Sequence, residues 1–186
     1  IINRASAQLK LLSEFKSAQV EHWLSDATEI AYLISASGEM QDDLSVFISP
    51  QEQDGALTTS PRDRIMAQLA VIHNAFPDTK SISLLHPVNG RILLSSDPTL
   101  EGRVRLNEDY FAKGQEELYV SPVAYSVGSE APVVYISDPV KKDNKLVAVV
   151  VVELDISDLD IFLRDGSGLG KGGSAYLVDA YGFYVT

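Results

Sequence analysis

The stretch from Leu106 to Leu159 decides the fold and contains LNEDYF (106–111), LYVSPVAYS (118–126), APVVYISDPV (131–140) and KLVAVVVVELDISDL (145–159). The last three segments are rich in β-branched and aromatic residues and are joined by short polar connections. This pattern predicts three consecutive antiparallel strands at about 118–125, 132–137 and 145–154. A short helix is expected to follow over residues 156–163, with Asp155 as its N-cap.

A hairpin and a helix are predicted upstream of these strands. In SISLLHPVNGRILLSS (81–96), two apolar runs flank Asn89-Gly90, a strong turn signal for a β-hairpin. Before it, Ser60 can cap a helix that has Pro61 in its first turn and ends at Pro77. Its apolar stripe is Ile65, Leu69, Ile72 and Phe76. Residues 99–117 are expected to form a loop with a short helical turn near Asp109.

The N-terminal region, residues 3–37, reads as one long helix. Apolar residues recur at spacings of three and four, which places them on one face: Val20, Trp23, Ala27, Ile30 and Ile34. Gly38 is expected to end this helix, and the acidic segment from Gly38 to Thr59 is expected to be a solvated loop. Two roles remain open for the helix, namely packing within the domain or leaving it toward a membrane.

The predicted helices and strands divide the chain into four parts. Hairpin connections predict an antiparallel sheet, and here a five-stranded sheet with helices on one face, in a PAS-like α+β arrangement. The glycine-rich segment 165–173 is read as a linker, and SAYLVDAYGFYVT (174–186) as a new hairpin. The expected organisation is a long N-terminal helix (1–38), a PAS-like module (39–164), the linker (165–173) and the first hairpin of a second PAS-like module (174–186).

Composition excludes several classes of function. The 186 residues are 45% hydrophobic and carry a net charge of -11, which argues against binding to nucleic acid or to an anionic membrane surface. The absence of cysteine excludes thiol catalysis and thiolate metal sites. The longest strongly apolar run, 146–152, is shorter than the roughly 20 residues that a transmembrane helix needs. The chain reads as an excised fragment, from which flanking membrane segments could have been removed.

No motif predicts catalysis, a metal or a cofactor. Gly168, Gly170 and Gly173 match GxGxxG, but a helix precedes them and a strand follows, which is the reverse of a dinucleotide-binding loop. The histidines lie on three predicted elements without paired spacing, and no nucleophile elbow is present. A hydrolase therefore has no supporting motif.

A cluster of aromatic residues is the best candidate for a binding site. Tyr110, Phe111, Tyr119, Tyr125 and Tyr135 could line a pocket or simply pack in the core, and the tyrosines leave both roles open. Arg103 and Arg105 could clamp an anionic group, or pair with surface carboxylates in a chain this acidic.

The chain resembles the double Cache (dCACHE) sensor family. The local matches are Tyr110-Phe111, Ser121-Pro122, the segment Ile136 to Val140 and the strand-helix joint Val149 to Leu159, with SAYLVDAYG at the start of the second module. The resemblance implies an extracytoplasmic, non-catalytic sensor of a small molecule, flanked by transmembrane helices. Its receptor would be a histidine kinase, or else a chemoreceptor or diguanylate cyclase.

One subgroup of that family recognises amino acids through an Arg, a Trp-Tyr pair, a Tyr and two Asp residues. An ungapped placement puts Glu108 at the Arg, Tyr110-Phe111 at the aromatic pair, Val123 at the Tyr, and Tyr125 and Asp155 at the two Asp positions. Only Asp155 is kept, and Glu108 reverses the sign of the carboxylate-binding position. The resemblance therefore implies a polar ligand that is cationic or neutral. The residues expected to bind it are Arg105, Glu108, Tyr110, Phe111, Val123, Tyr125, Tyr135 and Asp155.

The alternative function is a structural or dimerisation module without a small-molecule ligand. A homodimer is expected to form through the N-terminal helix, whose apolar stripe begins at Ala5, Leu9 and Leu12 and is broken by Lys16 and Gln19.

Overall fold

The computed structural model describes residues 2–49, 59–126 and 131–157, together with residues 159, 163, 175 and 178. The elements in chain order are α1 (Ile2–Ala36), α2 (Gly38–Ile48), α3 (Pro61–Ala75), β1 (Thr79–Leu85), β2 (Ile92–Ser95), the 3₁₀ helix η2 (Pro98–Leu100), α4 (Asp109–Gly114), β3 (Tyr119–Val120), β4 (Ala124–Ser126), β5 (Ala131–Lys142) and β6 (Lys145–Asp155). Most of the predicted helix 156–163, the linker 165–173 and the hairpin 174–186 lie outside the described residues. Within those residues, no helix combines the length and apolar character needed to cross a membrane.

The sheet is antiparallel, with the strand order β2-β1-β6-β5-β3, and β4 also pairs with β5. Within the described residues it therefore has six strands, and the prediction of five was wrong. The segment predicted as one strand at 118–125 is divided at Ser121-Pro122, and both halves pair with β5. Proline has no N–H to donate to the ladder, which explains the interruption.

The β5–β6 hairpin forms the centre of the sheet and is longer than the sequence predicted. β5 continues past residue 137 to Lys142, and the turn places Asp143 and Asn144 at φ 48° and 61°. Two residues at positive φ match the tight turn typical of hairpins. Pro139 does not interrupt β5, because β3 pairs with β5 only as far as Ser137 and proline is tolerated where a strand is an edge.

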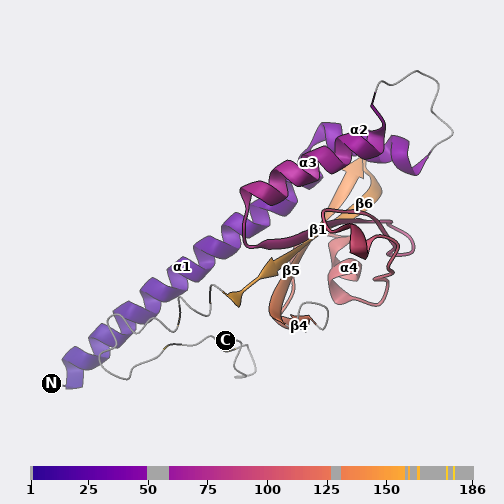
Figure 1. The fold of residues 1–186 in the computed structure, drawn as a ribbon. Helices are drawn as coiled ribbons and strands as arrows, with labels where there is room; N and C mark the ends of the chain where they lie inside the picture. Colours follow the sequence, from indigo (N-terminus) through magenta and orange to yellow (C-terminus); the bar gives the residue numbers. More distant parts are fainter. Residues whose placement is uncertain are drawn as a thin grey trace.

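Helices lie on both faces of the sheet (Figure 1). The helices α1, α2 and α3 cover one face, where they share a hydrophobic core with Ile82, Leu84, Val150, Val152 and Leu154. The short helix α4 lies over the other face, against Leu85, Val149 and Val151. The prediction of helices on one face only is corrected by α4. Alternation along β6 sends its successive side chains to opposite cores.

Helix α1 contacts the sheet with its C-terminal half and extends well beyond it (Figure 1). Ala27, Ile30 and Ile34 are buried, which confirms the predicted stripe. Leu11 and Phe15, further toward the N-terminus, are 65% and 59% exposed. Lys16 is buried, and its Nζ donates to the backbone oxygen of Leu163 at 3.2 Å.

The segment after α1 is helical, so the predicted acidic loop from Gly38 to Thr59 is wrong over its first part. Ser37 is the N-cap of α2, and its hydroxyl accepts a hydrogen bond from the Met40 N–H. Met40 and Leu44 are fully buried at helical spacing. Gly38 thus begins a helix rather than ending one. Residues 50–58 lie outside the described residues.

The predicted helix at 61–76 and the predicted hairpin at 81–96 are both confirmed. Ser60 accepts a hydrogen bond from the Asp63 N–H, and Pro61 is the first residue of α3. Gly90 has φ +63°, and a Cβ at this position would lie 2.7 Å from the backbone nitrogen of Leu106. Glycine is therefore required at this turn, where the chain from 103 to 106 passes close by.

Candidate ligand-binding site

A small pocket lies on the sheet face opposite α1. Its floor is formed by β1 and β6, and its walls by η2, the segment that leads to α4, α4 itself and β5. The lining residues are Ser81, Ser83, Leu85, Ile92, Leu100, Arg105, Tyr110, Tyr135, Val151 and Glu153. The free space inside it is about 20 Å³, which is enough for roughly one water molecule. In this conformation the pocket is too small for an organic ligand.

Two stacked tyrosines line the pocket. The rings of Tyr110 in α4 and Tyr135 in β5 lie 4.4 Å apart at an interplanar angle of 25°. The Ser137 hydroxyl donates to the backbone oxygen of Tyr110 at 2.7 Å and fixes α4 on the sheet. Burial raises the pKa of both tyrosine hydroxyls, so both stay neutral and available for hydrogen bonds.

The pocket contains one side chain of each charge. Glu153 lies between Ser81 and Tyr135 in the sheet register, and its carboxylate accepts a hydrogen bond from the Ser81 hydroxyl at 3.3 Å. Arg105 lies in the segment that covers the sheet, and among the described residues no carboxylate pairs with its guanidinium. The pocket can therefore present a positive and a negative group to one ligand.

Three of the predicted site residues, Arg105, Tyr110 and Tyr135, come together in this pocket. Phe111 is buried in the core beneath α4, next to them. Glu108 is the N-cap residue of α4; it is exposed, and its charge acts on both tyrosines.

The other three predicted residues lie elsewhere. Val123 packs against the hydrophobic core on the α1 side of the sheet. Tyr125 is 67% exposed on the edge strand β4. Asp155 lies at the end of β6 and outside the pocket lining. Its carboxylate accepts from the Ser157 N–H at 2.8 Å, as expected for a helix cap, and lies 3.2 Å from the Lys80 ammonium. Burial alone would raise the pKa of the Asp155 carboxyl, but its interactions with Ser157 and Lys80 outweigh burial and lower that pKa.

Glu153, Ser81 and Ser83 line the pocket and were not predicted from the sequence. The signal for Glu153 was present, because residues two apart on a strand share a face. Glu153 stands two residues before Asp155, and so it faces the same side of the sheet further toward its centre.

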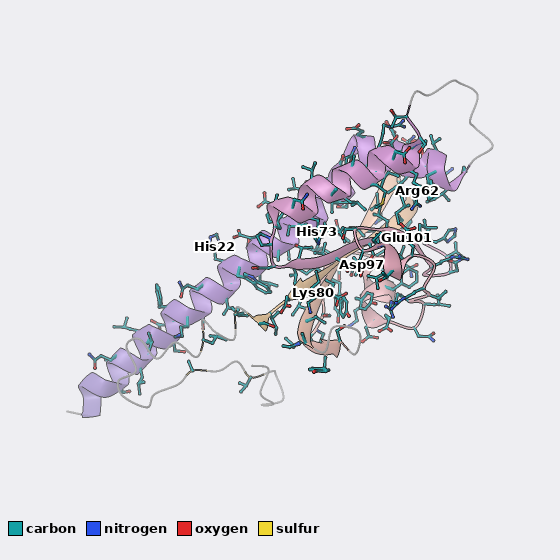
Figure 2. The ribbon with its side chains drawn as sticks, in the orientation of Figure 1. His22, Arg62, His73, Lys80, Asp97 and Glu101 are labelled. Atoms are coloured by element: carbon teal, nitrogen blue, oxygen red, sulfur yellow. The ribbon has the colours of Figure 1, made fainter. Side chains whose placement is uncertain are left out.

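The histidines have local structural contacts. His22 in α1 and His73 in α3 lie on separate helices (Figure 2). His22 Nδ1 is 3.6 Å from Asp26, His73 Nε2 is 3.3 Å from the backbone oxygen of Lys80, and His86 Nδ1 accepts from the Val88 N–H. The described part of the chain contains no group of three or more residues placed to hold a metal ion.

The sequence of this chain matches the model of a known family. The dCache_1 family model, which describes a Cache domain, matches residues 1–186. This chain belongs to the Cache domain family. The resemblance predicted from the 106–159 region is confirmed.

Solved structures of sensor and ligand-binding domains share the fold. The sensor domain of the V. cholerae histidine kinase DctB has a TM-score of 0.66 and 21% identity, over 91% of this chain and 59% of that chain. The ligand-binding domain of the Campylobacter jejuni chemoreceptor Tlp3, in complex with 4-methylisoleucine, has a TM-score of 0.69 and 16% identity, over 98% of this chain and 70% of that chain. The ligand-binding domain of the Pseudomonas aeruginosa amino acid chemoreceptor PctC, in complex with GABA, has a TM-score of 0.65 and 17% identity, over 95% and 72%.

This Cache domain spans less than two thirds of the DctB sensor domain. No curated protein matches the chain.

Proposed function

We propose that this Cache domain is the extracytoplasmic, non-catalytic sensor of a transmembrane receptor and binds a small polar molecule in the pocket beneath α4. The receptor would be a histidine kinase, or else a chemoreceptor or diguanylate cyclase, with transmembrane helices on either side of the sensor. The observation that carries this proposal is the pocket itself, where Arg105 and Glu153 stand beside the stacked Tyr110 and Tyr135. Aromatic walls with a few polar groups are typical of small-molecule sites.

The charges of the pocket favour a ligand that carries an ammonium group. The Glu153 carboxylate is suited to bind it, and the Arg105 guanidinium is suited to a carboxylate at the other end of the same molecule. The C. jejuni and P. aeruginosa domains were solved with 4-methylisoleucine and GABA, both of which carry both groups. A small amine or amino acid is therefore the proposed ligand class, with Glu108, Phe111 and Asp155 as further candidate residues. Val123, on the opposite face of the sheet, and the exposed Tyr125 are no longer among them.

Binding requires a movement, because a free space of about 20 Å³ cannot hold such a molecule. The segment that carries Arg105 and α4 must move away from the sheet, and the ligand would then separate the two tyrosine rings. A ligand that binds the open state better shifts the equilibrium toward it. This displacement of α4 relative to the sheet and α1 is the proposed signal.

The first test is a thermal-shift screen of the purified domain against amines, amino acids, organic acids and sugars. A ligand at 100-fold its dissociation constant stabilises a protein by about 2.7 kcal/mol, which for a chain of this size raises Tm by roughly 5–10 °C. Arg105→Gln and Glu153→Gln should each weaken binding roughly tenfold or more, because each removes a charge-assisted hydrogen bond. Arg103→Gln is the matched control, since Arg103 is exposed and lies outside the pocket lining. If Arg105→Gln and Glu153→Gln bind the ligand as tightly as the Arg103→Gln control does, this pocket is not the site.

A second function, a dimerisation module, is favoured by one observation. Leu9, Leu11 and Phe15 are exposed on the part of α1 that extends beyond the sheet. Pairing with a second α1 would bury them. Sedimentation equilibrium of the domain and of a Leu11→Glu, Phe15→Glu variant tests this, because a dimer formed through α1 should dissociate in the variant.

A further inference from the structure

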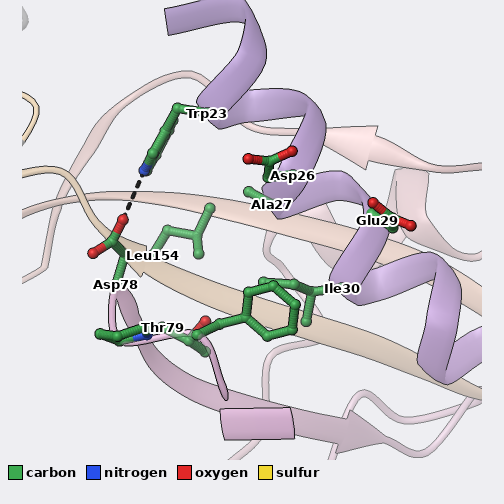
Figure 3. Close-up of a pocket in the computed structure, with 10 residues that line it drawn as sticks. Trp23, Asp26, Ala27, Glu29, Ile30, Asp78, Thr79 and Leu154 are labelled. Carbon is green, nitrogen blue, oxygen red and sulfur yellow. Dashed lines mark hydrogen bonds between the residues drawn. The ribbon is translucent and has the colours of Figure 1, made fainter. Parts of the chain in front are cut away.

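A second pocket lies on the opposite face of the sheet, between α1 and the turn that joins α3 to β1 (Figure 3). Its free volume is about 240 Å³, so it is far larger than the pocket beneath α4. The lining residues are Trp23, Asp26, Ala27, Glu29, Ile30, Phe76, Pro77, Asp78, Thr79 and Leu154.

The polar part of this lining has a single sign. Asp26 and Glu29 of α1 and Asp78 before β1 are carboxylates, and the described residues that line the pocket include no Lys, Arg or His. Asp26 has His22 at 3.6 Å, an imidazole that carries a charge only when protonated. In a chain of net charge -11, this pocket attracts cations.

The apolar part of the lining provides a surface for a hydrocarbon chain. Trp23 and Phe76 are half-buried, and Ile30 and Leu154 form the floor. The Trp23 indole N–H donates to Asp78 Oδ2 at 2.9 Å, which holds the ring and the carboxylate in place (Figure 3). An aromatic face beside a carboxylate is a favourable environment for an organic cation.

Thr79 in the lining contributes a buried polar atom that has no partner among the described residues. Thr79 is 3% exposed, and its hydroxyl is the buried side-chain oxygen that finds no hydrogen bond within the described part of the chain. Leaving a buried hydroxyl without a partner is unfavourable, and such groups are rare in folded proteins. Thr79 lines the pocket, and after a rotation of its side chain this hydroxyl can accept a hydrogen bond from a ligand N–H.

We propose that this pocket is a second ligand site, which binds a primary alkylammonium ion. The ammonium group donates to the Asp78 carboxylate and the Thr79 hydroxyl, Asp26 and Glu29 supply further negative charge at the entrance, and the alkyl chain packs on Trp23 and Phe76. A quaternary ammonium has no N–H to donate, and so it binds more weakly. The site is separate from the pocket beneath α4 and does not depend on the function proposed for that pocket.

The chain itself provides the reporter, because Trp23 is its one tryptophan. The experiment is a titration of the purified domain with n-butylamine, followed by tryptophan fluorescence, with tetramethylammonium and n-butanol as comparison probes. The expected result is a saturable fluorescence change with n-butylamine and a much weaker response to the other two. No saturable change in a folded sample would overturn the proposal, and an equal response to tetramethylammonium would overturn the assignment of a primary ammonium.

Two variants and one control assign the effect to this pocket. Asp78→Asn keeps an acceptor for the Trp23 N–H but removes the charge, so the dissociation constant for n-butylamine should rise roughly tenfold. Thr79→Val removes only the hydroxyl and should also weaken binding. Glu21→Gln makes the same change of charge on α1 at a residue outside the lining and should leave the affinity unchanged. An equal loss in Glu21→Gln would indicate a general charge effect and would overturn the site.

Discussion

The Ser35 hydroxyl of α1 donates a hydrogen bond to the Asp138 carboxylate of β5, across 103 residues of sequence. Ser35 is 6% exposed and Asp138 9% exposed. This bond is a buried polar contact between the long helix and the sheet. The Ser35 hydroxyl also lies 3.1 Å from the backbone oxygen of Tyr32, to which it can turn when Asp138 is protonated.

Removing the Ser35 hydroxyl should destabilise the fold. Ser35→Ala leaves the Asp138 carboxylate buried without this donor, and a buried acceptor that loses its partner costs about 1–3 kcal/mol. Urea denaturation monitored by circular dichroism measures the loss. Ser25→Ala is the matched control on the same helix, since Ser25 is exposed, and it should change the free energy of unfolding by less than about 0.5 kcal/mol. Equal effects in the two variants would contradict the role of Ser35.

The same carboxylate predicts a pH dependence. Burial raises the pKa of Asp138 above its ordinary value of 3.8, although the bond from Ser35 acts in the opposite direction. The folded state therefore binds the Asp138 proton more tightly than the unfolded state, and this group's contribution to stability falls as pH rises from 3.8 through the folded pKa. Asp138→Asn removes this contribution. The free energy of unfolding of the variant minus that of the wild type should be larger at pH 7 than at pH 4. If this difference does not change with pH, or is larger at pH 4, the pKa of Asp138 is not raised.

The fold was largely predictable from the sequence, and the misses have particular causes. The strands around Tyr135 and Val150 follow the pattern of β-branched residues, and α3 follows its Ser60 cap. Helix α2 was missed because its acidic residues suggested a loop. Its signals were present in the sequence: Ser37 is the N-cap, and Met40 and Leu44 are four residues apart, on one face of the helix.

The candidate site was less predictable than the fold. Tyr110, Tyr135 and Arg105 are far apart in sequence, and only the packing of α4 on the sheet brings them together. Their residue types are compatible with a pocket or with core packing, but no local pattern reports that the two rings stack against each other. Val123 lies on the α1 face of the sheet because the predicted strand 118–125 is interrupted at Pro122. The ungapped spacing of residues in the sequence did not show this interruption.

Helix α4 requires glycine at its close contact with the sheet. A Cβ at Gly114 would lie 2.6 Å from the Cβ of Ser137 and 3.1 Å from Val149 Cγ1. Gly114→Ala should therefore lower the free energy of unfolding by about 1–3 kcal/mol, the usual effect of overpacking. Gly38→Ala is the matched control: no atom lies within 4 Å of its added Cβ, and a Gly-to-Ala change in a helix should stabilise by about 0.4–1 kcal/mol. Differential scanning calorimetry should show Tm shifts of opposite sign.

Thr79 provides a test in which losing a polar group does no harm. Its hydroxyl is buried and has no partner in the described part of the chain, so replacing it with a methyl group removes an unfavourable burial. Thr79→Val should therefore leave Tm unchanged or raise it, which is unusual for a buried residue. Ser137→Ala is the contrasting variant. The Ser137 hydroxyl donates a hydrogen bond to the backbone oxygen of Tyr110, and the loss of this bond should lower Tm. A marked loss of stability in Thr79→Val would show that the hydroxyl has a partner.

The two acidic residues of β6 make different predictions, although they share one face of the sheet. Asp155 caps the following helix and pairs with Lys80, so Asp155→Ala should cost about 0.5–2 kcal/mol of stability. Glu153 lines the pocket, so Glu153→Gln should chiefly weaken binding of an amine or amino acid, with a smaller effect on Tm in the absence of ligand. Calorimetric titration and thermal unfolding of both variants separate these effects. If Asp155→Ala reduces affinity more than Glu153→Gln does, the ammonium group binds at the end of β6, where the family resemblance places it, rather than beside Tyr135.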